Sequence, residues 1–375
     1  VSKKQQRLTE VPAAVYVLTQ EDIRRSGATS IPEALRLAPG IQVARIDANK
    51  WAISVRGFNG RLANKVLVMI DGRRIYSPVF GGVYWDLQDM FLEDVERIEV
   101  IRGPGATLWG AGAVNGVINV ITKHARASQG GVASTGGGTG ERHFGGLRYG
   151  GQAGSAYYRA YAKYFQRDRF ATASGEPAQD DWNVLRGGFR ADWDLSPRDA
   201  FRLQGDLYRG RTHQQVEAFS LRPPFSRSFR DDARFEGGNL LARWERSSHE
   251  RSGTALQFYF DRTHRSEAIN AESADTWDVD FQHRVPLGER HDLQWGLEAR
   301  LMHDYLPTST LRSFEPEGRT QGLYAAFLQD ELRLAGDRLR FTLGTKLEHN
   351  AYTGLEIQPG AQLLWMPHRD HVLWG

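Results

Sequence analysis

Residues 185–195 read LRGGFRADWDL, and the pattern in this stretch decides the fold of most of the chain. Its odd positions hold Leu, Gly, Phe, Ala, Trp and Leu, whereas four of its five even positions hold Arg or Asp. A strict two-residue alternation is the signature of a β-strand with one apolar face and one charged face. The stretch therefore predicts a strand whose odd residues contact an apolar medium.

The same two-residue period returns throughout the C-terminal two thirds of the chain, clearly at residues 199–208, 293–301 and 339–348. These runs are about 10–14 residues long, which suits a tilted membrane-spanning strand, whereas soluble strands are mostly about 5–6 residues. Tyr158 and Tyr164 flank small residues, as in the aromatic belts at a membrane surface. A soluble sandwich would alternate as well, but the run length favours a membrane barrel.

The connections between these runs differ in length. A short one at 196–198 contrasts with long ones at about 214–234 and 307–318. Short turns on one side and long loops on the other are typical of outer-membrane barrels. We therefore predict a transmembrane antiparallel β-barrel over residues 125–375.

The composition excludes several classes of protein. The 375 residues carry a formal charge of +3, which is too small over this length to argue for a nucleic-acid partner. The absence of cysteine from the sequence excludes disulfide scaffolds, thiolate metal sites and cysteine nucleophiles. No apolar run approaches the roughly 20 residues that a membrane helix needs.

Residues 1–124 lack the long alternation and indicate a compact mixed α/β domain. Short apolar runs predict strands at 15–18, 53–55, 66–70 and 95–101. Thr19 with Asp22 and Ser30 with Glu33 are two helix-start patterns. In each, a hydroxyl can accept from a free amide of the first turn, while an acid sits at the positive end of the helix dipole.

Residues 98–116 combine a strand-like run with closely spaced glycines, the context of a nucleotide-binding loop. Two features argue against that site. No Gly-Lys-Ser/Thr follows, and residues 117–122 (VINVIT) are β-branched, so they predict a strand where a nucleotide fold has a helix. Since no metalloprotease motif and no nucleophile–base arrangement stands out, we assign no catalytic residue and no metal site, and we do not expect an enzyme.

Several motifs in series resemble a known family. Residues 98–123 (IEVIRGPGATLWGAGAVNGVINVITK) resemble the end of the plug domain of TonB-dependent outer-membrane receptors, such as the siderophore and colicin I receptors. The likeness extends back, in family order, through VYVLTQ (15–20), IPEALRLAPG (31–40), SVRGF (54–58) and VMIDGR (68–73). It implies a mixed α/β plug domain at 1–124, followed by part of a transmembrane β-barrel at 125–375.

Two features depart from the family pattern. The family barrel has 22 strands, whereas the alternation here accounts for about 12 or 13. No TonB box, the segment that recruits the inner-membrane protein TonB, is recognisable in residues 1–11. A half barrel would leave two unpaired edges in lipid, so we expect this sequence to be a fragment of a longer protein.

The resemblance implies TonB-dependent import across the bacterial outer membrane, with outer-membrane lipid around the barrel. A ferric siderophore is the expected cargo, and it is a ligand rather than a cofactor. Cobalamin, haem or another nutrient are alternatives, and a passive porin or structural barrel is an alternative of another class. A porin would have no plug.

The resemblance also implies roles for single residues. In the family, arginines of the VRGF and IRGP motifs pair with glutamates of the barrel wall, which implies a plug–barrel lock at Arg56 and Arg102. The two-residue alternation places Glu331 and Glu348 on the same face as neighbouring charged residues, which is the lumen face, so they are the candidate partners. The motif glycines are expected to allow positive φ or close packing of the plug backbone: Gly57, Gly103, Gly105, Gly110 and Gly116.

Ligand contacts are expected from the plug loops and from the extracellular barrel loops. Aromatic side chains there could stack on a flat catecholate, and arginines could pair with an anionic chelate. For the aromatic residues, burial in the plug core is the alternative. The plug candidates are Arg73, Arg74, Phe80, Tyr84 and Trp85.

Overall fold

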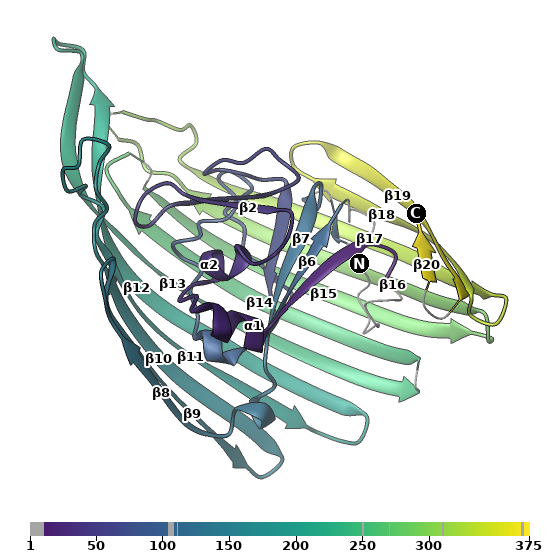
Figure 1. The fold of residues 1–375 in the computed structure, drawn as a ribbon. Coiled ribbons are helices and arrows are strands. Elements are labelled where there is room, and N and C mark those ends of the chain that lie inside the picture. The colour runs from purple at the N-terminus through teal and green to yellow at the C-terminus, as the bar shows by residue number, and fades with distance from the viewer. Residues whose placement is uncertain are drawn as a thin grey trace.

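The structure, a computed structural model, describes residues 11–103, 109–110, 112–249, 251–269, 271–309, 311–368 and 371–375. A 13-stranded sheet curves around a smaller body that contains a five-stranded and a two-stranded sheet (Figure 1). We call the large sheet the wall and the smaller body the plug. No helix in these residues combines the length and the apolar character needed to cross a membrane.

The plug elements are β1 (Ala14–Thr19), α1 (Gln20–Ser26), α2 (Ile31–Leu35), β2 (Ile41–Arg45), β3 (Trp51–Val55), β4 (Val66–Ile70), β5 (Arg73–Arg74), η2 (Leu92–Asp94), β6 (Val95–Arg102), β7 (Gly116–Thr122) and η3 (Ala125–Ser128). The five-stranded sheet has the order β1-β6-β7-β4-β5, in which only β4 and β7 are parallel among the described strands. The predicted plug strands are confirmed, including β7 in place of a nucleotide-site helix.

The two helix-start patterns behave differently. Thr19 caps α1 as predicted, since its hydroxyl accepts from the amide of Asp22 (3.2 Å) and its own amide donates to the Asp22 carboxylate (2.9 Å). Ser30 is the N-cap residue of α2, but its side chain makes no cap hydrogen bond. Glu33 accepts instead from the guanidinium of Arg36 (2.7 Å) and from the indole N–H of Trp51 (3.2 Å).

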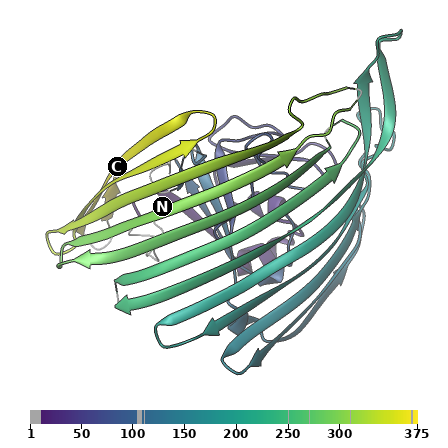
Figure 2. The same cartoon turned by 180° about the vertical axis from the view of Figure 1, so that it is seen from behind.

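The wall strands are β8 (Gly130–Gly136), β9 (Glu141–Ala153), β10 (Ala156–Arg167), β11 (Trp182–Asp194), β12 (Asp199–Phe219), β13 (Ser226–His249), β14 (Ser252–Ser266), β15 (Glu272–Leu287), β16 (His291–Tyr305), β17 (Gly318–Leu334), β18 (Leu339–Asn350), β19 (Gly354–His368) and β20 (His371–Trp374). All neighbours are antiparallel, with β8 and β20 at the edges. The plug lies on the concave side, and Figure 2 shows the wall from behind. The 13 strands agree with the predicted 12 or 13.

Burial confirms the predicted parity of the wall. In β11, Leu185 and Phe189 are exposed, whereas Arg186, Arg190 and Asp192 are buried on the plug side. The large apolar residues of the convex face, such as Leu185 and Phe189, are thus left uncovered by the residues that the structure describes. An uncovered apolar face backed by a charged inner face is what a lipid-embedded strand requires.

Two wall strands are much longer than predicted. β12 and β13 have 21 and 24 residues, and residues 213–219 pair with 226–232 beyond the limits of β11 and β14. They project past the other strands as a hairpin (Figure 1). The predicted long loop at about 214–234 is therefore wrong, because cross-strand pairing continues to Phe219 and Ser226. The short turn at 196–198 and the long loop at 307–318 are confirmed by the strand bounds.

The hydrophobic core of the plug continues into the wall. One buried cluster joins plug residues such as Leu18, Ile98 and Val120 to wall residues of β10 to β13, namely Phe165, Trp182, Val184, Tyr208 and Phe235. The ring of Trp182 meets Phe165 edge-on, with centroids 4.7 Å apart. The plug is therefore seated against this part of the wall by apolar contact as well as by charge.

Candidate functional site at the plug–wall interface

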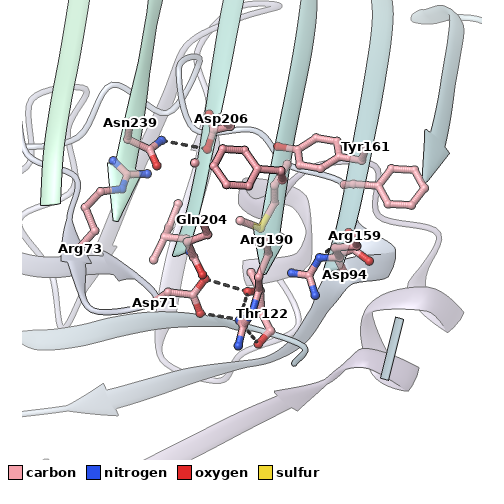
Figure 3. A pocket seen from close by; sticks show the side chains of 15 residues that line it. Asp71, Arg73, Asp94, Thr122, Arg159, Tyr161, Arg190, Gln204, Asp206 and Asn239 are labelled. Carbon is pink, nitrogen blue, oxygen red and sulfur yellow. Dashed lines mark hydrogen bonds and ion pairs between the residues drawn. The ribbon is translucent and has the colours of Figure 1, made fainter. Parts of the chain in front are cut away.

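Asp71 lies directly after β4, at the boundary between plug and wall (Figure 3). Its carboxylate accepts from the amide (2.9 Å) and the hydroxyl (2.7 Å) of Thr122 in β7. It also accepts from the side-chain amide of Gln204 in β12 (2.8 Å), and Arg202 of the same strand lies 3.9 Å away. One carboxylate therefore ties two plug strands to the wall.

Two opposing effects act on the pKa of Asp71. Burial by itself raises this pKa, but the positive charges of Arg190 and Arg202, with hydrogen bonds from Thr122 and Gln204, outweigh it. The pKa therefore lies below its ordinary value, and the buried side chain is a carboxylate at neutral pH. Arg190 also donates to the carbonyl (3.1 Å) and hydroxyl (2.8 Å) of Thr122.

Asp94, at the end of η2, meets two arginines of the wall, of which Figure 3 shows Arg159. Its carboxylate oxygens lie 3.3 Å from Nε of Arg148 in β9 and 3.1 Å from Nε of Arg159 in β10. Burial is the largest effect on this group, and it raises the pKa of Asp94 in spite of the two arginines. Asp94 is thus a second ionic contact, made where the carboxylate is poorly solvated.

Two further plug aspartates bind cations of the wall. Lys163 of β10 donates to Asp89 (2.8 Å), and Arg265 of β14 donates to Asp86 (2.7 Å). Arg265 is 1% exposed, and its guanidinium lies 4.9 Å from the ring centroid of Tyr84 in the plug. Charged pairs therefore link the plug to wall strands from β9 to β14.

Cavities remain between the plug and the wall. A small one of about 50 Å³ lies among Asp71, Asp94, Arg159 and Arg190 (Figure 3), which is space for a few water molecules. A larger one of about 760 Å³ separates the face of the plug sheet from strands β12 to β16. The interface is thus polar and incompletely filled, unlike a protein core.

The structure gives the predicted ligand-contact residues other partners. Arg73 forms an ion pair with Asp261 of β14, and Arg74 lies 3.0 Å from Glu298 of β16. Tyr84 donates to Glu272 of β15 (2.9 Å). Trp85 is buried in the plug core, and Phe80 is half-buried with its ring edge-on to Tyr84. Ligand binding by these residues stays a prediction.

The two arginines of the predicted lock lie near each other. Arg56 follows β3 with φ of 60°, and a Cβ at Gly103 would lie 3.6 Å from its Nη1. Arg102 ends β6, and its side chain packs against Gly40, where an added Cβ would lie 3.0 Å from Arg102 Cδ. The lock therefore has its arginines on one part of the plug.

The two glutamates of the predicted lock bind wall cations. Glu331 lies 3.2 Å from Arg333, and Glu348 lies 3.4 Å from Lys346. Within the described part of the chain, no ion pair joins either glutamate to Arg56 or Arg102. In this structure the four residues do not form the predicted ion pairs. A lock between the plug arginines and glutamates of the wall therefore stays a prediction.

The motif glycines differ in what they permit. Gly110 has φ of +86°, and a Cβ there would lie 2.7 Å from Glu348 Oε2, so the plug backbone meets the wall at this point. Gly116 lies so close to Ile101 that a Cβ would be 2.4 Å from its carbonyl oxygen. Gly57 and Gly103 have positive φ, and Gly105 lies outside the described residues.

Sequence reasoning missed the four interface aspartates, Asp71, Asp86, Asp89 and Asp94. Local charge was an available signal, because residues 86–94 carry four acids and no base while the inner faces of β10 and β11 are rich in arginine. To pair the acidic segment with the arginine-rich strands, one has to know that these parts of the chain face each other. That information is tertiary.

An α/β plug fixed to the concave side of a curved antiparallel wall is the architecture of a plugged membrane barrel, and two family models match the chain accordingly. The TonB-dependent Receptor Plug Domain matches residues 7–117, and the TonB dependent receptor-like, beta-barrel model matches residues 124–375. The chain belongs to the TonB-dependent receptor family and is a bacterial outer-membrane receptor.

Curated relatives are matched over part of their length. The vitamin B12 transporter BtuB of Vibrio vulnificus is 39% identical over 137 residues, which are 36% of this chain and 22% of that protein. The iron-regulated outer membrane virulence protein of Vibrio cholerae is 24% identical over 381 residues, covering 96% of this chain and 55% of that protein. The chain thus spans about half the length of the second relative.

Solved structures share the fold. The siderophore receptor PirA from Pseudomonas aeruginosa matches with a TM-score of 0.72 and 20% identity, over 96% of this chain and 60% of that one. FpvA from P. aeruginosa, bound to heterologous pyoverdines, matches with a TM-score of 0.72 and 17% identity, over 98% and 56%.

Proposed function

We propose that this receptor imports a ferric siderophore across the outer membrane, with energy delivered through TonB. The observation that carries the proposal is the seated plug, which Asp71, Asp86, Asp89 and Asp94 hold against the wall. A plug bound this way closes the passage until force moves it. A passive porin has no use for such a plug, so energy coupling is the better account.

The cargo is inferred from the relatives. The match to the iron-regulated protein covers 96% of this chain, and siderophore receptors share its fold. The receptor would bind and move an intact chelate, so its residues need to recognise and release the ligand rather than transform it. TonB is the proposed partner, and it would pull on the plug from the periplasmic side.

Cobalamin is the second candidate cargo. One observation favours it: the identity to vitamin B12 transporters reaches 39%, although over only 36% of this chain. The longer match to an iron-regulated protein outweighs this shorter one, because cargo contacts are expected from the barrel as well as from the plug.

Uptake by cells that make this receptor as their sole TonB-dependent importer tests the proposal. We expect accumulation of iron from a ferric siderophore, and abolition of that uptake by collapse of the proton gradient or by deletion of TonB. If cells take up labelled cobalamin but no ferric chelate, cobalamin is the cargo and the siderophore proposal is wrong. Uptake that persists without TonB would refute energy coupling.

A further inference from the structure

The charges that line the concave face of the wall are divided between its two halves. In strands β9 to β14, as far as the structure describes them, six cations and one anion are buried: Arg148, Arg159, Arg167, Arg186, Arg190 and Arg265 against Asp192. In the described parts of β15 to β18, seven anions and three cations are buried: Glu272, Asp278, Asp292, Glu298, Asp304, Glu331 and Glu348 against Arg300, Arg340 and Lys346. The first half is basic and the second is acidic.

Half-buried charges do not remove this division. On the lumen side of β9 to β14 they are close to balance: Lys163, Arg202 and Arg243 against Glu141, Asp206, Asp231 and Asp261, while Glu245 beside Arg243 is exposed. Several wall cations also have wall partners, as in the bidentate bond of Arg190 to Asp192. The excess of positive charge nevertheless stays on the first half.

The plug complements both halves. Its aspartates face the basic half: Asp71 toward Arg202, Asp86 toward Arg265, Asp89 toward Lys163, and Asp94 toward Arg148 and Arg159. Its Arg74 faces Glu298 in the acidic half. At rest, plug carboxylates therefore neutralise part of the basic wall.

Movement of the plug away from β9 to β14 would leave those cations without their carboxylate partners. Unpaired buried charge is expensive, and an anion that enters the space would restore the lost interactions. A cation would gain less: it could replace Arg73 at Asp261 or Arg74 at Glu298, but Glu298 keeps Arg300 and Lys346 as wall partners. The larger cavity already separates the plug sheet from the wall, and Arg202 and Arg243 line it on its β12–β13 side.

We propose that the cargo is an anionic chelate and that it crosses between the plug and the basic half of the wall, β9 to β14, where it takes over charge pairing from the plug aspartates. This inference rests on the proposed function, to which it adds the charge of the substrate and the side of the plug along which it passes. It concerns the wall beside and beneath the plug, not the extracellular binding surface.

Arg243 provides the test, because its side chain lines the cavity while its hydrogen bonds go to Glu245 (2.7 Å) and Gln257 (3.2 Å), both of the wall. Arg284 is the matched control. It is a lumen cation of the acidic half that lies near the C-terminal end of β15, as Arg243 lies near the C-terminal end of β13, and it also binds a wall residue, Asp292. The variants are Arg243→Gln, Arg243→Lys and Arg284→Gln in the intact receptor. The probes are a trianionic tris-catecholate chelate and a neutral tris-hydroxamate chelate of iron(III).

For the trianionic chelate, we expect Arg243→Gln to lower the maximal uptake rate about fivefold. This is less than the roughly 10–10³-fold effect of a whole charged lining, because only one of its charges is removed. The Kd of this variant for the trianionic chelate at the cell surface should not change. Arg243→Lys should restore the uptake rate of the trianionic chelate. Arg284→Gln should not lower that rate comparably, and Arg243→Gln should not lower the uptake rate of the neutral chelate comparably. Three outcomes would overturn the charged path but not the proposed function. They are an unchanged uptake rate of the trianionic chelate in Arg243→Gln, failure of Arg243→Lys to restore that rate, and equal losses for both chelates in Arg243→Gln. Uptake of neither chelate by the unaltered receptor would overturn the proposed function itself.

Discussion

Arg265 of β14 and Asp86 of the plug form an ion pair of 2.7 Å across the plug–wall boundary, although 179 residues separate them in the chain. Arg265 is almost wholly buried, and Glu267 lies 3.5 Å from its Nε. Glu267 follows β14 in the wall, so of these two contacts only the one with Asp86 joins the plug to the wall. This pair therefore gives a direct measure of how firmly the plug is seated.

Asp86→Ala should loosen the plug, because it leaves Arg265 buried with a single acidic neighbour. Removing one partner of a buried pair costs about 3–5 kcal/mol, and Glu267 should keep the loss near the lower end. The measurement is the denaturant concentration at which a protease cleaves the plug of the detergent-solubilised receptor. Glu21→Ala, which removes an exposed pair with Arg25, should have no measurable effect. Equal resistance of the two variants would contradict the seating role of Asp86.

Phe189→Arg should impair assembly of the barrel. Phe189 is exposed on the apolar face of β11, near the middle of the strand. An arginine at the bilayer midplane of a barrel costs about 2–4 kcal/mol. The yield of heat-modifiable barrel in outer-membrane fractions measures the effect, and Phe189→Leu serves as the control. A normal yield of the arginine variant would show that this face does not contact lipid.

Gly116→Ala should destabilise the plug. The added Cβ would lie 2.4 Å from the carbonyl oxygen of Ile101, a backbone atom that cannot move without distorting the β6–β7 pairing. Overpacking of this kind costs about 1–3 kcal/mol. At Gly60 an added Cβ meets nothing within 4 Å, so Gly60→Ala should leave the protease resistance of the plug unchanged. Similar resistance of both variants would argue against close packing at Gly116.

The plug should loosen in acid, in part through Asp71. Its pKa lies below the ordinary value, so its contribution to stability is present above an ordinary aspartate pKa of about 4 and is lost as the pH falls through its lower folded-state pKa. Asp71→Asn should reduce protease resistance at pH 7 and flatten the decline below about pH 4. An acid profile parallel to that of the unaltered receptor would exclude Asp71 as a contributor.

Local sequence was sufficient for most of the wall, but not for its long β12–β13 hairpin. The parity of Leu185, Arg186, Phe189 and Arg190 predicts which side chains face lipid, because successive residues of a strand point to opposite faces. The strand number followed from counting such runs. The β12–β13 hairpin was not predicted, because pairing beyond the neighbouring strands depends on cross-strand contacts rather than on the residues of either strand alone.

The plug–wall interface was decided by tertiary structure. Motif glycines and arginines were visible in the sequence, yet the ion pairs that join the plug to the wall involve Asp71, Asp86, Asp89 and Asp94, which belong to no periodic pattern. Their sequence positions show that they are acidic and lie near apolar residues, but not which cation each one meets. Alternation is a property of one strand and can be read locally, whereas a buried ion pair depends on the distance between two segments, and only the folded chain sets that distance.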